Sequence, residues 1–236
     1  IKEAQIVILY IQTKYHETVI KRMIPYLNEE QVLLINPGHL STAYVLKHKG
    51  NKNLIIAEAT SSFVDCRISQ PGKVRVYFRN VRNPLGIYPV NKKEYAKNLL
   101  DQLGFPFSYF HCVVEAALHN PNLIVHTVGA IMSIPRIEAT EGNYVMYHEV
   151  FTPSVWKILE ALDSEKMDII AKLGFERISY AEMAKFRNTL DDSIDAKESF
   201  YNYALMPNNA IGPTKVDSRY ISEDVPQGLV MLEALG

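Results

Sequence analysis

Cysteine is scarce in this sequence, and long uninterrupted hydrophobic runs are missing from its first half. The two cysteines, Cys66 and Cys112, have neither the number nor the spacing of a disulfide framework or a zinc site. This scarcity is typical of a reducing compartment, so a cytoplasmic protein is expected. The early apolar run at residues 6–11 is too short for a membrane helix and lacks the flanks of a signal peptide. No membrane association is therefore expected.

An excess of either charge is also missing. Lysine and arginine number 25 against 26 aspartate and glutamate, which leaves a net charge of -1. Such a balance offers no general attraction to nucleic acid or to an anionic membrane. The 236 residues, 47% of them hydrophobic, are enough for a sizeable core and for two modest domains. Small molecules or other proteins are the expected partners.

Strand-like and helical segments alternate up to about residue 104. Strand patterns occupy residues 4–11, 31–38, 53–60 and 73–81, and helical patterns occupy residues 15–27 and 41–50. This alternation, with short connections, predicts an α/β fold with a mostly parallel sheet. Ligands of such sheets bind beyond the carboxyl ends of the strands. The loops after Ile11, Ile35 and Ala57 are therefore expected to face any ligand.

From about residue 105 onward the strand signal fades. Long helical patterns at residues 153–174 and 179–190 dominate this half of the chain. The sequence therefore predicts two domains: an α/β domain over residues 1–104 and an all-α domain over residues 105–236.

A histidine and a proline interrupt the apolar run at residues 115–132. Pro121 has no backbone N–H and fits the first position of a helix, with Asn120 as the cap before it. Two helical segments with a break at His119 are therefore predicted. A metal site shared with His126 is disfavoured, because seven helical residues rise about 10 Å whereas zinc ligands converge on one ion. His119 is either a buried structural histidine or a side chain that points into a cleft.

The second informative stretch is "SRYISEDVPQGLVMLEALG", residues 218–236. Arg219 and Asp224 precede a helix that Pro226 is expected to start. Hydrogen-bond acceptors and negative charge are favourable at a helix N-terminus, which accounts for Asp224 without any functional role. The same argument does not account for Arg219.

Together, "HNPNLIVHTVGAIM" and "RYISEDVPQGLV", with "LINPG" and a strand that ends before "QTKYH", resemble the octopine/nopaline (opine) dehydrogenase family. The resemblance implies the second half of a Rossmann-like nucleotide-binding domain followed by a helical catalytic domain. It also implies NAD or NADP as the cofactor and an amino acid and a 2-oxo acid such as pyruvate as substrates. No metal is expected, and a homodimer is one possible assembly. The family reaction condenses the two substrates and reduces the resulting imine by hydride transfer.

The resemblance also implies roles for residues of the two motifs. His119 falls on the acid/base histidine, Asp224 on its carboxylate partner and Arg219 on the substrate-binding arginine, with Asn120 beside the substrate. Histidine suits proton transfer in both directions because its unperturbed pKa lies near 6.5. Arginine suits a carboxylate because its planar guanidinium can form two parallel hydrogen bonds. Both substrates carry carboxylates.

Residues of the first domain receive cofactor roles by the same resemblance. The turn formed by Asn36, Pro37 and Gly38 is expected beside the nicotinamide, His16 is expected to line the cofactor cleft, and Thr60 is a candidate for contact with the oxo acid. The alternative for Thr60 is that it is an ordinary loop hydroxyl without a binding role. The alternative for His16 is that it lies in a solvated helix start.

The sequence departs from the family in one respect, because it contains no G-x-G-x-x-G turn for a pyrophosphate. This fingerprint is expected upstream of Ile1, and the end of the helical domain is expected beyond Gly236. Two other functions stay open. One is a 2-hydroxy-acid or ketopantoate-type reductase, and the other is a binding domain that has lost the cofactor.

Overall fold

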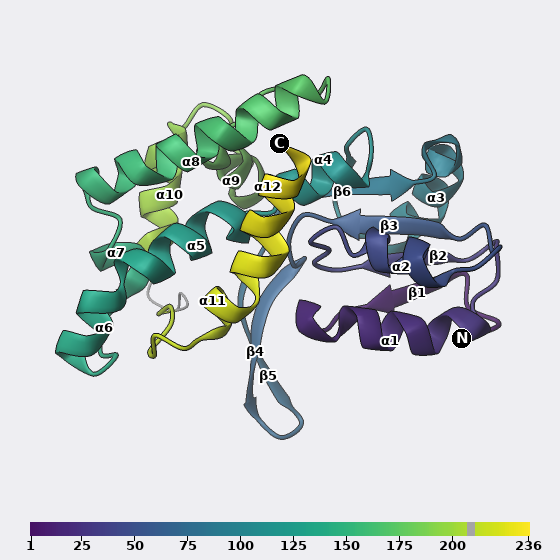
Figure 1. Ribbon diagram of the computed structural model, residues 1–236, viewed down its shortest axis with the longest axis horizontal. Coiled ribbons are helices and arrows are strands. Elements are labelled where there is room, and N and C mark those ends of the chain that lie inside the picture. The colour runs from purple at the N-terminus through teal and green to yellow at the C-terminus, as the bar shows by residue number, and fades with distance from the viewer. Residues whose placement is uncertain (207–210) are drawn as a thin grey trace. The chain divides into compact units, whose positions relative to one another are not determined.

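The computed structural model describes residues 1–206 and 211–236, which form two compact units (Figure 1). The α/β unit consists of Ile1–Phe63 and Arg82–Asn120, and the helical unit consists of Val64–Val81 and Pro121–Gly236. The predicted end of the first domain is residue 104. In the structure the α/β unit runs on to Asn120, because α4 (Val113–Leu118) packs on the strands of that unit.

The α/β unit contains a five-stranded sheet, which confirms the predicted fold class. Its strands, in spatial order, are β1 (Ile6–Leu9), β2 (Val32–Ile35), β3 (Ile55–Ala59), β6 (Asn83–Tyr88) and β7 (Phe107–Tyr109). The pairs β1–β2, β2–β3 and β6–β7 are parallel, whereas β3 and β6 are antiparallel. Every residue of β2 and β3 is buried, as is typical of parallel strands covered on both faces.

The helices of this unit are short. They are α1 (His16–Met23), α2 (Thr42–His48), α3 (Lys93–Leu100) and α4, with 3-10 turns at Thr13–Tyr15, Ile24–Tyr26, Val90–Lys92 and Asp101–Leu103. Of these helices, α1 and α3 are amphipathic. Ile20, Met23 and Ile24 follow the helical spacing and join the buried core with Leu33 and Ile56. Each such aliphatic side chain stabilises the fold by about 1.5–3 kcal/mol when fully buried.

The helical unit contains the two long predicted helices. Its helices are α5 (Asn122–Met132), α6 (Ile134–Thr140), α7 (Met146–Glu149), α8 (Pro153–Lys172), α9 (Tyr180–Asn188), α10 (Ala196–Ala204), α11 (Arg219–Ser222) and α12 (Val230–Leu235), with a π-helical turn at Val225–Leu229. Thr152 and Ser179 cap α8 and α9 by accepting hydrogen bonds from Val155 N and Glu182 N. Among the described residues, none of the helices combines the length and the apolar composition needed to cross a lipid bilayer.

Helix α5 forms the centre of this unit, and residues 123–130 are all buried. The predicted break is present, because α4 ends at Leu118 with His119 as its C-cap. The predicted cap was Asn120, but Pro121 takes that place. The carbonyl of Pro121 accepts hydrogen bonds from Ile124 N and Val125 N, so the helical ladder starts one residue later than expected.

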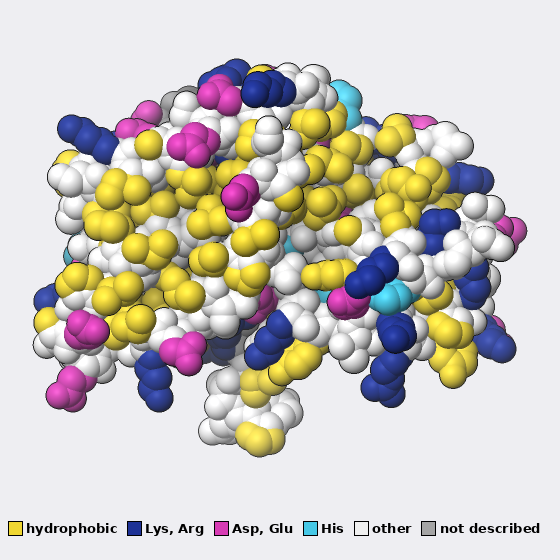
Figure 2. All heavy atoms as spheres, viewed as in Figure 1, with side chains coloured by type: hydrophobic (Ala, Val, Ile, Leu, Met, Phe, Trp, Pro, Cys, Tyr) yellow, Lys and Arg dark blue, Asp and Glu magenta, His cyan; other side chains and the backbone are white. Residues whose placement is uncertain are grey.

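A β-hairpin, β4 (Val64–Gln70) and β5 (Lys73–Arg79), belongs to the helical unit, which is therefore not purely α-helical. The strand predicted at residues 73–81 does not join the parallel sheet but pairs antiparallel with β4. The ring of Phe78 packs edge-on against Tyr203 at 5.8 Å, and Val81 N donates to the carbonyl of Arg187. These contacts attach the base of the hairpin. Ile68 and Val74 are exposed, and Figure 2 shows hydrophobic side chains on the surface of the hairpin.

Candidate active site

A buried histidine, His126, links two polar side chains inside the helical unit. Its Nδ1 lies 2.8 Å from Oδ2 of Asp224, and its Nε2 lies 3.1 Å from the hydroxyl of Tyr147. Burial holds the pKa of Tyr147 well above its usual value, so this hydroxyl stays protonated and can donate to Nε2. A neutral imidazole then satisfies both contacts, with Nδ1–H donating to Asp224. The carboxylate therefore fixes the tautomer of His126.

The ring of Tyr220 covers His126. The two ring centroids are 4.0 Å apart with a tilt of 59°, and Tyr220 is itself buried. Burial also raises the pKa of Tyr220, which keeps its hydroxyl neutral. Tyr220 forms part of the wall of a pocket, so His126 lies directly behind that wall.

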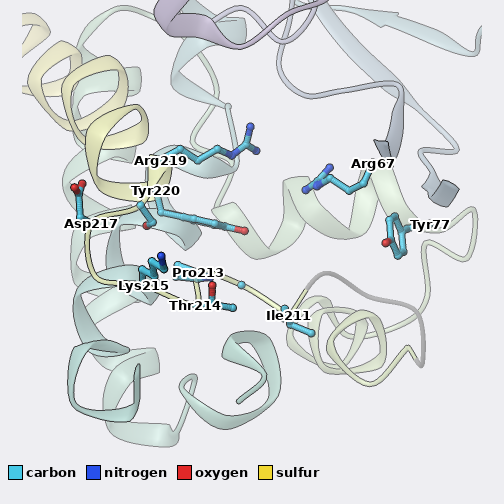
Figure 3. Close-up of a pocket in the computed structure, with 11 residues that line it drawn as sticks. Arg67, Tyr77, Ile211, Pro213, Thr214, Lys215, Asp217, Arg219 and Tyr220 are labelled. Carbon is cyan, nitrogen blue, oxygen red and sulfur yellow. The ribbon is translucent and has the colours of Figure 1, made fainter. Parts of the chain in front are cut away.

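This pocket has a volume of about 540 Å³ and is rich in positive charge (Figure 3). Its lining comes from the hairpin and from the segment before α11: Arg67, Tyr77, Ile211, Gly212, Pro213, Thr214, Lys215, Asp217, Ser218, Arg219 and Tyr220. Three of these side chains are cationic and one is anionic. An anionic ligand is therefore favoured over a cationic one.

Arg219 lies exposed at the first position of α11 and reaches into this pocket. Within residues 1–206 and 211–236 its side chain makes no hydrogen bond or ion pair. The structural alternative, an ion pair with a neighbouring carboxylate such as Asp224, thus finds no support. Its guanidinium can instead bind a carboxylate that enters the pocket.

His119 and Asn120 end the α/β unit. Both are buried, and the imidazole of His119 stacks on Phe110 with ring centroids 5.0 Å apart. Asp224, the carboxylate partner that the resemblance implies for His119, belongs to the helical unit and forms a hydrogen bond with His126. The expected pairing of His119 with Asp224 stays a prediction.

Two buried polar side chains stand at the carboxyl ends of adjacent parallel strands in the α/β unit. Asn36 follows β2 and Thr60 follows β3, and their exposed fractions are 0% and 1%. The amide of Asn36 and the hydroxyl of Thr60 make no hydrogen bond within the described part of the chain. Because buried polar groups are nearly always hydrogen-bonded, these two fit a polar ligand such as the carboxamide of a nicotinamide.

The rest of the predicted turn has a packing explanation. Pro37 follows Asn36 through a cis peptide bond. A Cβ added to Gly38 would lie 1.8 Å from Cγ of Glu58, so Glu58 alone requires a glycine here. No cofactor contact is needed to account for Gly38.

His16 connects two loops of the α/β unit. It is fully buried, with Nδ1 at 2.7 Å from Oγ of Ser41 and Nε2 at 3.1 Å from the carbonyl of Ile11. Protein groups thus engage both ring nitrogens. This geometry supports a role in holding the loops after β1 and β2 and gives no support to direct cofactor contact.

From the sequence, His126 is disfavoured as a metal ligand, and neither Tyr147 nor Arg67 is predicted as a site residue. Within the described ranges no group of three or more histidine, cysteine or acidic side chains could hold a metal ion. His126 lies in the same "HNPNLIVH" motif as His119, and a histidine inside an otherwise apolar helix could have identified it. The sequence pattern gives no signal for Arg67, because the segment that contains it is predicted to belong to the α/β domain.

Known proteins resemble this chain over its whole length. The chain is 27% identical over its whole length to an opine dehydrogenase of Arthrobacter sp. (strain 1C) and 22% identical over 98% of its length to a vitopine synthase of Allorhizobium ampelinum. It spans 66% and 64% of these curated relatives. Among solved structures, octopine dehydrogenase in complex with NADH and agmatine shares the fold, with a TM-score of 0.72 at 17% identity over the whole chain and 65% of that structure.

A family model describes the helical part directly. The model for the α-helical domain of NAD/NADP octopine/nopaline dehydrogenases matches residues 110–236, which is more than half of the chain. This chain belongs to the NAD/NADP octopine/nopaline dehydrogenase family.

Proposed function

We propose that the protein containing this chain condenses an amino acid with a 2-oxo acid and reduces the imine to an opine with NADH or NADPH. The observation that carries this proposal is His126, held between Asp224 and Tyr147 behind an arginine-lined pocket. The names of the two curated relatives, an opine dehydrogenase and a vitopine synthase, support the same reaction class.

His126 is proposed as the acid and base of this reaction. Condensation removes a proton from the amine and delivers protons to the leaving oxygen, and a histidine can serve both steps. Nε2 of His126 must release the hydroxyl of Tyr147 to do so. Asp224 stabilises the imidazolium that forms when Nε2 takes a proton. The contact of Asp224 with Nδ1 of His126 supports this assignment, and the assignment of the same role to His119 stays an alternative prediction.

Arg219 is proposed to bind a substrate carboxylate, and Asn36 and Thr60 are proposed to hold the nicotinamide carboxamide. The amide of Asn36 offers donors and an acceptor, and the hydroxyl of Thr60 offers one of each. When bound, the cofactor supplies the hydride that reduces the imine carbon. Asn120 and His119, buried at the end of the α/β unit, are proposed to shape the substrate side of that site.

Paired substitutions test the choice of histidine. In the protein that contains this chain, His126→Gln should lower kcat of amino-acid-dependent NADH oxidation by about 10²–10⁴-fold, the usual effect of losing a general acid/base. The matched variant His119→Gln should lower it by less than about tenfold, because proton transfer is retained. The reverse ranking would assign the acid/base to His119. A His126→Gln protein that folds and keeps kcat within about threefold would exclude His126.

A further inference from the structure

We propose that the pocket of the helical unit selects a dicarboxylic amino acid, with Arg219 holding the α-carboxylate and Arg67 holding the side-chain carboxylate. This inference rests on the proposed function and names the substrate class of that same site. It predicts aspartate or glutamate as the amino donor and predicts rejection of amino acids with cationic side chains.

Arg67 is placed to bind an anion. It lies on β4, and 48% of its side-chain surface is exposed, on the wall of the pocket. Its Nη1 donates to Oδ1 of Asp65 at 2.7 Å and to the carbonyl of Cys66 at 2.8 Å. Within the described ranges, Nε and Nη2 make no hydrogen bond. One edge of the guanidinium is thus fixed by the protein, and the other edge is available to a carboxylate.

Arg219 and Arg67 face each other. Figure 3 shows the two guanidinium groups directed toward one another from opposite walls, one from α11 and one from the hairpin. Two positive charges in such an arrangement repel each other. A ligand with a carboxylate at each end removes this repulsion and forms charge-assisted hydrogen bonds with both groups.

The charge of the whole lining favours the same ligand. Arg67, Lys215 and Arg219 contribute three positive charges, and Asp217 and the Asp65 partner of Arg67 contribute two negative ones. Figure 3 places Asp217 at the far side of the pocket from Arg67. A ligand guanidinium or ammonium near Arg67 would meet repulsion without a free counterion on that wall.

The order of the two carboxylates follows from the position of His126. Tyr220 follows Arg219 directly, and its ring packs at a tilt of 59° against the imidazole of His126, so Arg219 lies on the side of the pocket where proton transfer is proposed. The amine that reacts is bonded to the same carbon as the α-carboxylate. The α-carboxylate therefore belongs on Arg219, and the side chain extends toward Arg67.

Steady-state kinetics of the protein that contains this chain test the inference. With pyruvate and NADH or NADPH, kcat/KM should be at least about tenfold higher for the better of L-glutamate and L-aspartate than for L-glutamine, and L-arginine should be poorer still, since a charge-assisted pair is lost or replaced by repulsion. Arg67→Gln should lower the ratio of kcat/KM for the acidic amino acid to kcat/KM for L-glutamine at least about tenfold. Lys73→Gln removes the same charge from the exposed tip of the hairpin, outside the pocket lining, and should leave the ratio unchanged.

Three results would overturn the inference. One is an unchanged ratio in Arg67→Gln, and another is a preference for L-arginine. The third is a loss of kcat/KM in Arg67→Gln that appears when 2-oxoglutarate replaces pyruvate but does not appear when the acidic amino acid is used. That result would place the second carboxylate on the oxo acid.

A binding experiment separates this inference from the proposed function. Glutarate and butyrate, titrated into this chain by calorimetry, should differ, with glutarate binding at least about tenfold more tightly and losing that advantage in Arg67→Gln. If no amino acid and oxo acid support NAD(P)H oxidation, the proposed function fails, while glutarate selectivity still supports the pocket. Equal binding of the two acids refutes the pocket assignment whatever the activity.

Discussion

The imidazole of His126 and the carboxylate of Asp224 form a hydrogen bond of 2.8 Å, although 98 positions separate them in the sequence. Both side chains are buried, with exposed residue fractions of 7% and 3%. A buried carboxylate without a partner is strongly unfavourable, so the bond with His126 accounts for a charge at this depth. The pair joins the central helix α5 to the turn that follows α11.

Asp224→Asn should lower kcat by about 10²–10⁴-fold while the protein stays folded, because an amide can occupy the space but cannot stabilise an imidazolium. Kinetics of NADH oxidation, with the melting temperature measured beside them, check this outcome. Asp168→Asn is the matched control, because Asp168 is an exposed aspartate of the helical unit that lies outside the pocket lining. A similar loss of kcat in both variants would contradict a specific role for Asp224.

Tyr147→Phe should destabilise the chain by about 1–3 kcal/mol, because Nε2 of the buried His126 loses its hydrogen-bond donor. Urea unfolding measures the effect. Tyr201→Phe is the control, since that hydroxyl makes a longer bond of 3.3 Å to the carbonyl of Phe151 at a partly exposed position. We expect the control to cost less than about 1 kcal/mol. Equal costs would show that Tyr147 contributes only its ring.

Arg219→Lys should raise the apparent KM for one carboxylate substrate at least about tenfold, or about 1.4 kcal/mol, because an ammonium cannot reproduce two parallel hydrogen bonds. The KM for NADH and the melting temperature should hardly change, since Arg219 forms no ion pair within the described residues. Measuring the three KM values and the melting temperature checks this prediction. A lower melting temperature with unaltered KM values would make Arg219 a structural residue.

Stability of the α/β unit should fall as the pH rises from about 4.5 to about 7. Burial raises the pKa of Glu58 from 4.5 to about 7, and hydrogen bonds from Thr42 and Ser41 oppose this shift. Because the folded pKa is the higher one, the stabilising effect is complete below pH 4.5 and is lost as the pH approaches 7. The change amounts to about 3 kcal/mol at most.

Urea unfolding of the chain at several pH values measures this dependence. Glu58→Gln cannot ionise and should remove the fall in stability over that window, whatever its effect at a single pH. If the variant and the original chain show the same pH dependence, Glu58 is not its source.

Local chemistry explains why parts of the fold were predictable. Strand β2 is a continuous apolar run, and β3 is apolar apart from Glu58. Helices α8 and α9 have helical periodicity and N-terminal caps, so these elements can be predicted from residues that are close in the sequence. Pro121 breaks the helix wherever it lies, because it lacks a backbone N–H. The family motifs likewise lie within short segments that can be read without a structure.

The tertiary structure decided which of these segments meet. Two histidines stand seven residues apart in one motif, and the packing of α5 beneath Tyr220 brings the second of them, His126, to Asp224. The hairpin carrying Arg67 lies within the first half of the sequence, yet the contact of Phe78 with Tyr203 attaches it to the helical unit. Sequence periodicity reports the environment along one element, whereas these pairings depend on contacts between elements far apart in the chain.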